Sequence, residues 1–212
     1  MATKQNGKFK VARYGVLGGT FDPIHNAHLH VAVVALEELN LDKIIFIPSG
    51  IPPHKAKHEV TRADHRLMMT TLAINGNDNF FVSETEVNRA GESYTIQTMR
   101  ELRDENFSAA EFYFIVGADA FTQIETWAMY EDLLKITKFV VVTRTGSDNK
   151  TLDETIEKYK NNFGADIYKI SIPNLEISST DIRSRIKRGK NVEYLIPAVV
   201  VEYIRKYNIY KN

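Results

Sequence analysis

Two histidines lie three residues apart, shortly after a pair of glycines, near the start of the chain. Residues 18–29 read Gly-Gly-Thr-Phe-Asp-Pro-Ile-His-Asn-Ala-His-Leu, which places His25 and His28 at the beginning of an expected helix. At this spacing the two imidazole rings share one helix face and converge on one small volume. Gly18 and Gly19 allow a sharp backbone turn close to a ligand, and the amides of a helix N-terminus bind phosphate. The segment therefore predicts an anion-binding site.

Simpler explanations of this segment exist. A glycine pair alone is more often only a turn, and a zinc site would lack a third ligand beside the two histidines. The spacing matches neither Gly-x-x-x-x-Gly-Lys nor Gly-x-Gly-x-x-Gly, so the two common phosphate-binding loops are excluded. The combination of strand, glycines, histidines and helix nevertheless favours a functional site.

A second group of hydrogen-bond donors lies near the other end of the chain. Residues 177–183 read Ile-Ser-Ser-Thr-Asp-Ile-Arg. Ser179 is expected to cap a helix, and hydroxyls at its N-terminus together with Arg183 would form a second anion site. Taken alone, this segment is better explained as an ordinary capped helix with a solvated basic face.

Short β-branched or aromatic runs alternate with longer helical patterns along the chain. The runs predict strands at 11–17, 43–47, 79–83, 112–116, 138–143 and 166–171. The helical patterns lie at 27–39, 62–75, 94–105, 127–134, 152–162, 180–188 and 198–207. The strands are apolar on both faces, which is typical of parallel strands covered by helices on each side. We therefore expect an α/β fold with a doubly wound, mostly parallel, Rossmann-like sheet, whose ligands bind beyond the carboxyl ends of the strands.

Length and composition limit the function classes. The 212 residues predict one domain over 1–212, with a helical C-terminal portion over about 176–212. Lys plus Arg and Asp plus Glu are both 27, so no overall field attracts nucleic acid or an anionic membrane. The absence of cysteine excludes disulfides, thiolate metal sites and cysteine nucleophiles. With no signal peptide and no apolar span, we expect a soluble cytoplasmic protein.

The two motifs together resemble the nucleotidylyltransferase superfamily of the His-x-Gly-His type. Within it, the segments at 51–55, 93–95 and 116–119, followed by Trp127, are similar to the bacterial nicotinate-nucleotide adenylyltransferases. The resemblance extends from about residue 14 to residue 210 and implies the nucleotidylyltransferase fold. It also implies a reaction in NAD biosynthesis: ATP and nicotinate mononucleotide form deamido-NAD and pyrophosphate. Mg²⁺ would be held mainly by the ATP phosphates and water.

The resemblance also implies roles for individual residues. The catalytic groups would be His25, His28 and Arg183, which contact the triphosphate. The ATP site would consist of Gly18, Gly19, Thr20, Phe21, Ser179, Thr180 and Arg183. The mononucleotide site would consist of Lys55 on the phosphate, Thr95 and Trp127 on the nicotinate ring, and Asp119 on ribose hydroxyls. No residue is assigned to a metal.

Several points depart from the family or stay open. Ala27 stands where the family usually has glycine, and its methyl group would crowd the adenosine. Asp22 is expected to support the turn, and Arg62 and Arg66 to cover a helix surface. The alternatives are a phosphopantetheine adenylyltransferase and a non-catalytic nucleotide sensor. The oligomeric state, including a homo-oligomer, and the choice between nicotinate and nicotinamide mononucleotide stay open.

Overall fold

The computed structural model describes residues 4–5, 8–9, 11–53, 60–104, 110–146 and 149–211. The strands are β1 (Lys4–Gln5), β2 (Lys8–Phe9), β3 (Ala12–Gly19), β4 (Lys43–Pro48), β5 (Phe80–Val82), β6 (Ala110–Gly117), β7 (Lys138–Arg144) and β8 (Ile167–Ile172). The helices are α1 (Asn26–Glu38), α2 (Ala63–Ile74), α3 (Thr85–Asn88), α4 (Thr95–Asp104), α5 (Ala118–Phe121), the 3-10 helix η2 (Ile124–Thr126), α6 (Tyr130–Ile136), α7 (Lys150–Phe163), α8 (Ser179–Lys187) and α9 (Ala198–Tyr207).

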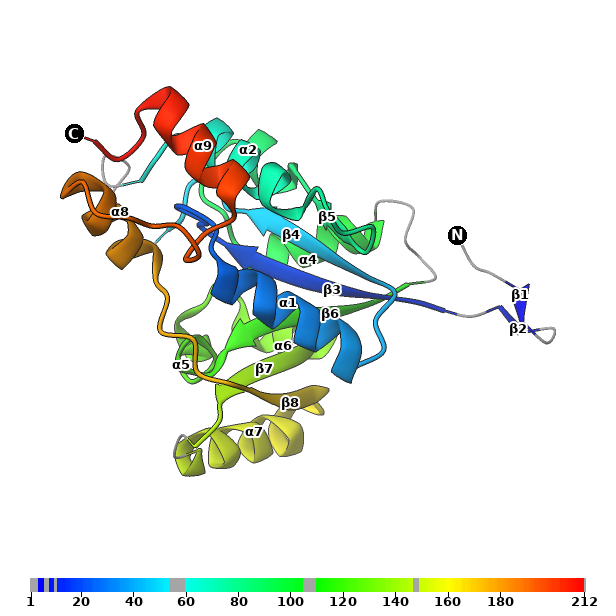
Figure 1. The fold of residues 1–212 in the computed structure, drawn as a ribbon. Coiled ribbons are helices and arrows are strands. Elements are labelled where there is room, and N and C mark those ends of the chain that lie inside the picture. Colours follow the sequence, from blue (N-terminus) through cyan, green and yellow to red (C-terminus); the bar gives the residue numbers. More distant parts are fainter. Residues whose placement is uncertain are drawn as a thin grey trace. The chain divides into compact units, whose positions relative to one another are not determined.

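A six-stranded sheet has the order β5-β4-β3-β6-β7-β8. β3 pairs in parallel with β6, β6 with β7, and β7 with β8. Figure 1 shows the helices α4 and α6 behind the strands β6 and β7. The doubly wound α/β fold predicted from the apolar strand runs is therefore confirmed. In β7 the side chains of Phe139, Val140, Val141 and Val142 are at most 8% exposed, as a strand covered on both faces requires.

The predicted elements are all present, with ends shifted by at most three residues. The largest shift concerns α6, which was expected to begin at Trp127. It begins at Tyr130 instead, because Met129 adopts the left-handed region at φ 52° and Trp127 is extended at ψ 144°. Trp127 therefore lies in a connection between two helices. No helix in the described part of the chain combines the length and the apolar character that crossing a membrane requires.

The chain divides into two compact units, each described by itself. Unit 1 consists of Met1–Gly18, Val34–Ile45 and Tyr94–Asn174, and unit 2 of Gly19–Val33, Phe46–Ser93 and Leu175–Asn212. Three elements, β3, α1 and β4, run from one unit into the other. The expectation of a single domain over residues 1–212 stays a prediction.

Aromatic side chains connect the core of unit 1 to Trp127. The rings of Phe121 and Phe139 lie 5.5 Å apart, and that of Phe114 lies 6.0 Å from Phe139. The Trp127 indole meets Phe114 edge to face at 6.0 Å. Such aromatic pairs contribute roughly 1 kcal/mol each beyond burial. The core of unit 1 therefore fixes the orientation of the indole.

Helices α2 and α9 pack side by side in unit 2 (Figure 1). α9 buries Val200, Val201 and Ile204 on one face. His65 on α2 shares a hydrogen bond of 2.9 Å with the Tyr203 hydroxyl of α9. One face of α9 therefore lies in the core of unit 2.

Candidate active site

The turn that follows β3 depends on Gly19 and Phe21. Phe21 adopts the left-handed region at φ 48° and is only 2% exposed. A Cβ atom at Gly19 would lie 2.8 Å from the Phe21 ring, so only glycine fits there. A Cβ at Gly18 would meet the Phe114 ring at 3.6 Å, an ordinary contact. Packing therefore requires glycine at position 19 and not at position 18.

The rings of His25 and His28 stack on each other at the start of α1. Their centroids are 3.6 Å apart, and the ring planes are inclined by 17°. The backbone amide of His25 donates to His28 Nδ1 at 3.2 Å, which assigns the proton of a neutral His28 to Nε2. The Phe21 ring meets the edge of His28 at 5.0 Å and fixes its orientation. The predicted convergence of the two rings is present in the structure.

Both histidines are neutral at pH 7. Burial lowers the pKa of His25 to about 4. Burial, and then the charge that His25 would carry, lower the pKa of His28 well below its ordinary value. Among the described residues, no group forms a hydrogen bond with the buried His25 Nδ1. A buried ring nitrogen without a partner fits a site whose ligand supplies that partner.

The second motif contacts the first within unit 2. The Ser179 hydroxyl donates to the Pro23 carbonyl oxygen at 2.9 Å. Arg183 Nη1 donates to the Asp22 carbonyl oxygen at 2.9 Å, and its Nη2 donates to Thr180 Oγ1 at 3.3 Å. The N-terminus of α8 and the histidine pair thus belong to one assembly of donors.

The cap of α8 differs from the prediction. Ser178, and not Ser179, is the N-cap residue, since its Oγ accepts from the amide of Asp181 at 3.1 Å. Ser179 is the first residue of the helix, and its hydroxyl is used for the contact with Pro23. Two adjacent hydroxyls in the same sequence context cannot be told apart without the backbone angles, which explains the error.

Asp22 supports the turn with both carboxylate oxygens. Its Oδ1 accepts from the Tyr210 hydroxyl at 2.5 Å, and its Oδ2 accepts from the amide of Thr61 at 3.1 Å. It is 3% exposed. In the ranges that the structure describes, no cluster of three or more His, Cys, Asp or Glu side chains could hold a metal ion.

Arg66 is not the surface residue that the sequence indicated. It is 1% exposed and donates to three carbonyl oxygens, whereas Arg62 is exposed as expected. The signal was present in the spacing, because Arg66 shares one face of α2 with the buried residues Met69, Thr70 and Ile74.

The residues matched to the mononucleotide lie on separate elements of unit 1. Thr95 begins α4, Asp119 is exposed on α5 after β6, and Trp127 follows η2. No hydrogen bond or ring contact joins these three in the described part of the chain. Lys55 lies outside the described residues.

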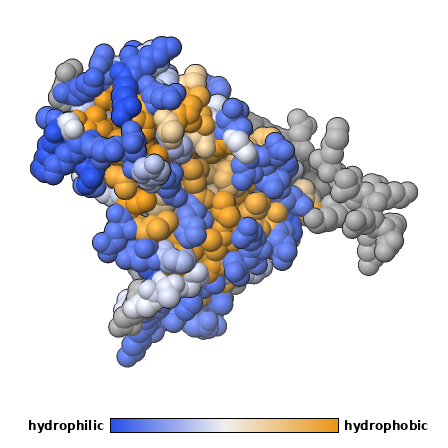
Figure 2. All heavy atoms as spheres, viewed as in Figure 1, coloured by the Kyte–Doolittle hydropathy of each residue, from blue (hydrophilic) through white to orange (hydrophobic). Residues whose placement is uncertain are grey.

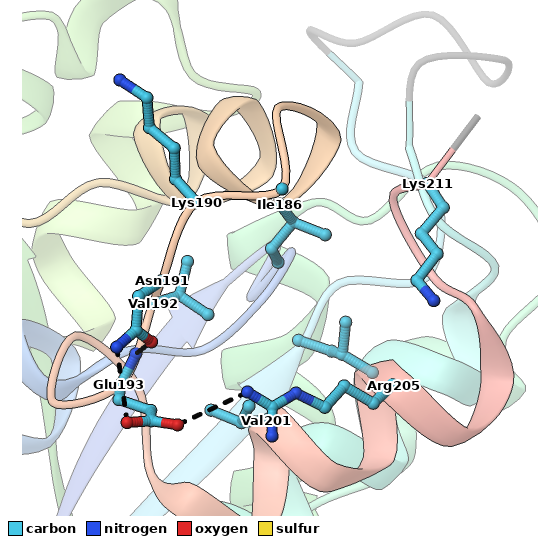
Figure 3. Close-up of a pocket in the computed structure, with 10 residues that line it drawn as sticks. Ile186, Lys190, Asn191, Val192, Glu193, Val201, Arg205 and Lys211 are labelled. Atoms are coloured by element: carbon cyan, nitrogen blue, oxygen red, sulfur yellow. Dashed lines mark hydrogen bonds and ion pairs between the residues drawn. The ribbon is translucent and has the colours of Figure 1, made fainter.

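A cavity of about 620 Å³ in unit 2 is lined by other residues. Its lining comes from the end of α8, the segment that follows up to Glu193, α9 and Lys211, and includes no residue of the two motifs. Figure 3 shows Arg205 reaching toward Glu193, to which it is ion-paired at 3.4 Å, while Lys190 points away from them. The candidate active site is therefore assigned to the two motifs and not to this cavity.

Known proteins are similar to this chain over nearly its whole length. The family described as Cytidylyltransferase-like matches residues 16–185. A probable nicotinate-nucleotide adenylyltransferase of Thermoanaerobacter sp. (strain X514) is 46% identical over 200 residues, which cover 94% of this chain and 95% of the relative. One from Moorella thermoacetica (strain ATCC 39073 / JCM 9320) is 45% identical over 199 residues, 94% of this chain and 92% of the relative.

A solved structure shares the fold. Plasmodium falciparum nicotinic acid mononucleotide adenylyltransferase complexed with NaAD matches with a TM-score of 0.78 at 23% identity. The match covers 94% of this chain and 97% of that chain. At this identity the likeness concerns the fold alone.

Proposed function

Because the chain belongs to the nicotinate-nucleotide adenylyltransferase family, we propose that it transfers the adenylyl group of ATP to nicotinate mononucleotide, forming deamido-NAD and pyrophosphate in NAD biosynthesis. The observation that carries the proposal is the assembly of both motifs in unit 2. There the stacked pair of His25 and His28 lies at the turn whose carbonyls accept from Ser179 and Arg183.

The reaction needs no protein nucleophile. A phosphate oxygen of nicotinate mononucleotide attacks the α-phosphorus of ATP, and the bond from this phosphorus to the bridging oxygen of the β-phosphate breaks. Pyrophosphate leaves with the electron pair of that bond. The protein's task is to align two anions and to stabilise the charge on the leaving group.

The groups of unit 2 suit this task. His28 offers its Nε2–H as a donor to the triphosphate. The triphosphate also supplies the partner that His25 Nδ1 lacks among the described residues. Arg183 adds a fixed positive charge through its remaining N–H groups. We assign the rest of the ATP site to the backbone of Gly18, Gly19, Thr20 and Phe21 and to Ser179 and Thr180.

The acceptor half of the proposal rests on the family. Lys55 would bind the mononucleotide phosphate, Thr95 and Trp127 the nicotinate ring, and Asp119 the ribose. Mg²⁺ would be bound by the ATP phosphates and water, as this ion prefers, while the buried Asp22 carboxylate supports the turn. The cytoplasmic location expected from the sequence is part of this proposal.

Pyrophosphate release tests the function directly. The protein is incubated with Mg-ATP and with nicotinate mononucleotide, nicotinamide mononucleotide or phosphopantetheine in parallel. We expect fast release with nicotinate mononucleotide. Release with phosphopantetheine alone would overturn the acceptor assignment, and no release with any of the three would overturn the proposed reaction.

His28→Ala separates catalysis from binding. Loss of a group that acts on the transferring phosphoryl lowers kcat by roughly 100-fold or more, while the affinity for ATP changes much less. His65→Phe, which keeps a ring on α2 where His65 contacts Tyr203 and Tyr207 of α9, is the matched control and should retain wild-type turnover. Equal, modest losses of kcat and of ATP affinity in His28→Ala would contradict the catalytic role.

A further inference from the structure

Arg66 joins three separate segments of unit 2. Its Nη1 donates to the Thr20 carbonyl, its Nη2 to the Gly50 carbonyl and its Nε to the Thr61 carbonyl, each at 2.8 Å. These carbonyls belong to the turn after β3, to the segment that follows β4 and to the segment that leads into α2. One buried guanidinium thus determines the positions of three chain segments that meet beside the histidine pair.

Gly50 shows how tightly this junction is packed. A Cβ atom at position 50 would clash with the backbone carbonyl oxygen of Glu86. The Gly50 amide donates to Ser93 Oγ at 3.0 Å, and its carbonyl accepts from Arg66. The junction therefore has room only for glycine at position 50.

Asp22 provides the negative charge of the same junction. Among the charges near Arg66, the Asp22 carboxylate contributes most to keeping the Arg66 guanidinium protonated. It is 3% exposed, and its two oxygens accept from Tyr210 and from the Thr61 amide. Thr61 is therefore held twice, through its carbonyl by Arg66 and through its amide by Asp22.

Tyr210 contributes a hydroxyl from far along the sequence, 188 residues after Asp22. Burial and the Asp22 charge raise the pKa of Tyr210 far above its ordinary value, so that the hydroxyl keeps its proton and donates it. Its backbone adopts the left-handed region at φ 66°, which turns the side chain back toward the junction. The Tyr210 hydroxyl contacts the junction through Asp22, the residue between Phe21 and Pro23, and through a further hydrogen bond with Thr61.

We propose that Tyr210 is a positioning residue for adenylyl transfer: its hydroxyl fixes the Asp22 carboxylate, and thereby the turn Thr20–Pro23 and Thr61, in the arrangement that presents the histidine pair to ATP. The inference deepens the proposed function and rests on it for the kinetic readout only.

Tyr210→Phe removes the hydroxyl and keeps the ring. Loss of a hydrogen bond to a charged group of this kind should lower kcat/KM for ATP roughly tenfold or more, with most of the loss in kcat. Hydrogen exchange should quicken at the amide of Thr61 and at the amides of residues 20–22. Tyr207→Phe, on the exposed side of α9, is the matched control and should change neither quantity.

Asp22→Asn gives a second route to the same conclusion. An uncharged amide offers one acceptor oxygen in place of two, so it cannot accept from both Tyr210 and Thr61 as the carboxylate does, and it removes the negative charge of the junction. The single variants should each lose activity, and the double variant should lose little more than either, because they interrupt the same interaction. Additive losses would overturn the proposal.

The outcomes also separate this inference from the proposed function. Wild-type kinetics and wild-type exchange at Thr61 in Tyr210→Phe, with an active parent enzyme, would overturn the positioning role. A lower melting temperature with unchanged kcat and KM would do the same, since it would show a purely structural role. If the parent protein releases no pyrophosphate with any acceptor, the function fails, while the exchange rates still decide the role of Tyr210.

Discussion

The stacking of His25 and His28 makes it costly to protonate both rings at once. The rings of His25 and His28 are too close, at 3.6 Å, to be protonated together at low cost. In the free protein both are neutral, and a bound triphosphate favours their charged forms. Neutral rings in the free enzyme avoid a buried like-charge pair and still offer the Nε2–H of His28 to the ligand.

The depressed pKa of His25 predicts how stability varies with pH. Its pKa falls from 6.5 in an unfolded chain to about 4 in the fold. Between these values the unfolded chain binds a proton that the folded protein does not, so the contribution of His25 is complete above pH 6.5 and is lost as the pH falls toward 4. The loss amounts to about 3 kcal/mol.

Urea unfolding of wild type and of His25→Gln at several pH values between 7 and 4 measures this contribution. Carboxylates titrate in both proteins, so the difference between the two curves reports His25 together with its effect on the pKa of His28. We expect the free energy of unfolding to fall more steeply for wild type than for His25→Gln as the pH is lowered. Parallel curves would contradict the prediction.

Residue types and spacing predicted only part of the site. His25, His28 and Arg183 were recognisable because chemistry-bearing types followed a strand or began a helix. Arg66 and Tyr210 were not, because their roles arise from carbonyls and a carboxylate supplied by segments distant in sequence. A sequence shows which side chain is available, but the partners of a buried donor depend on tertiary packing.

At the scale of elements, α8 connects the two motifs through its first turn. Ser178 caps the helix, and Ser179 attaches it to the Pro23 carbonyl. The two adjacent hydroxyls therefore have different roles. Ser178 stabilises the helix itself, whereas Ser179 joins the helix to the turn that contains Pro23.

Alanine substitution of each serine distinguishes these roles. Ser178→Ala removes a cap and should lower the free energy of unfolding by about 1 kcal/mol, with little change in the KM for ATP. Ser179→Ala removes the hydrogen bond between the first residue of α8 and the Pro23 carbonyl and should lower kcat/KM for ATP several-fold. Thermal unfolding and steady-state kinetics of the two variants give the comparison, and identical kinetic profiles would count against the assignment.

Periodicity predicted long elements and missed short ones. Every strand of the six-stranded sheet and every helix of seven or more residues followed an apolar pattern in the sequence. The missed helices α3, α5 and η2 have three or four residues, which is too short for a 3.6-residue period to repeat. Their positions depend on the packing around β5 and β6 rather than on local pattern.

The whole chain has no net charge, but its C-terminal segment is basic. Residues 175–212 contain eight Lys or Arg and four Asp or Glu residues. Figure 2 shows strongly hydrophilic side chains gathered over α8, which contains Arg183 and Arg185. A neutral protein thus presents a local positive field beside its second motif.

This local field predicts a salt effect on ATP binding. Raising NaCl from about 50 mM to about 500 mM shortens the screening length to a few ångströms and should raise the KM for ATP several-fold, with a smaller change in kcat. The exposed residues Lys187 and Arg188 contribute to the field without belonging to the site, so Lys187→Gln with Arg188→Gln should weaken the dependence. A KM that does not respond to salt would contradict the prediction.

The contact between Asp22 and Tyr210 has a consequence for biosynthesis. A ribosome that has just released Asp22 must add 188 more residues before Tyr210 exists, which takes roughly 10 to 40 s at usual elongation rates. Meanwhile the continuous stretch Tyr94–Asn174 supplies β6, β7 and β8, whose pairings with one another all lie within it. The nascent chain therefore passes through a stage in which half of the sheet can already form, whereas the Asp22 carboxylate cannot yet form its hydrogen bond with Tyr210.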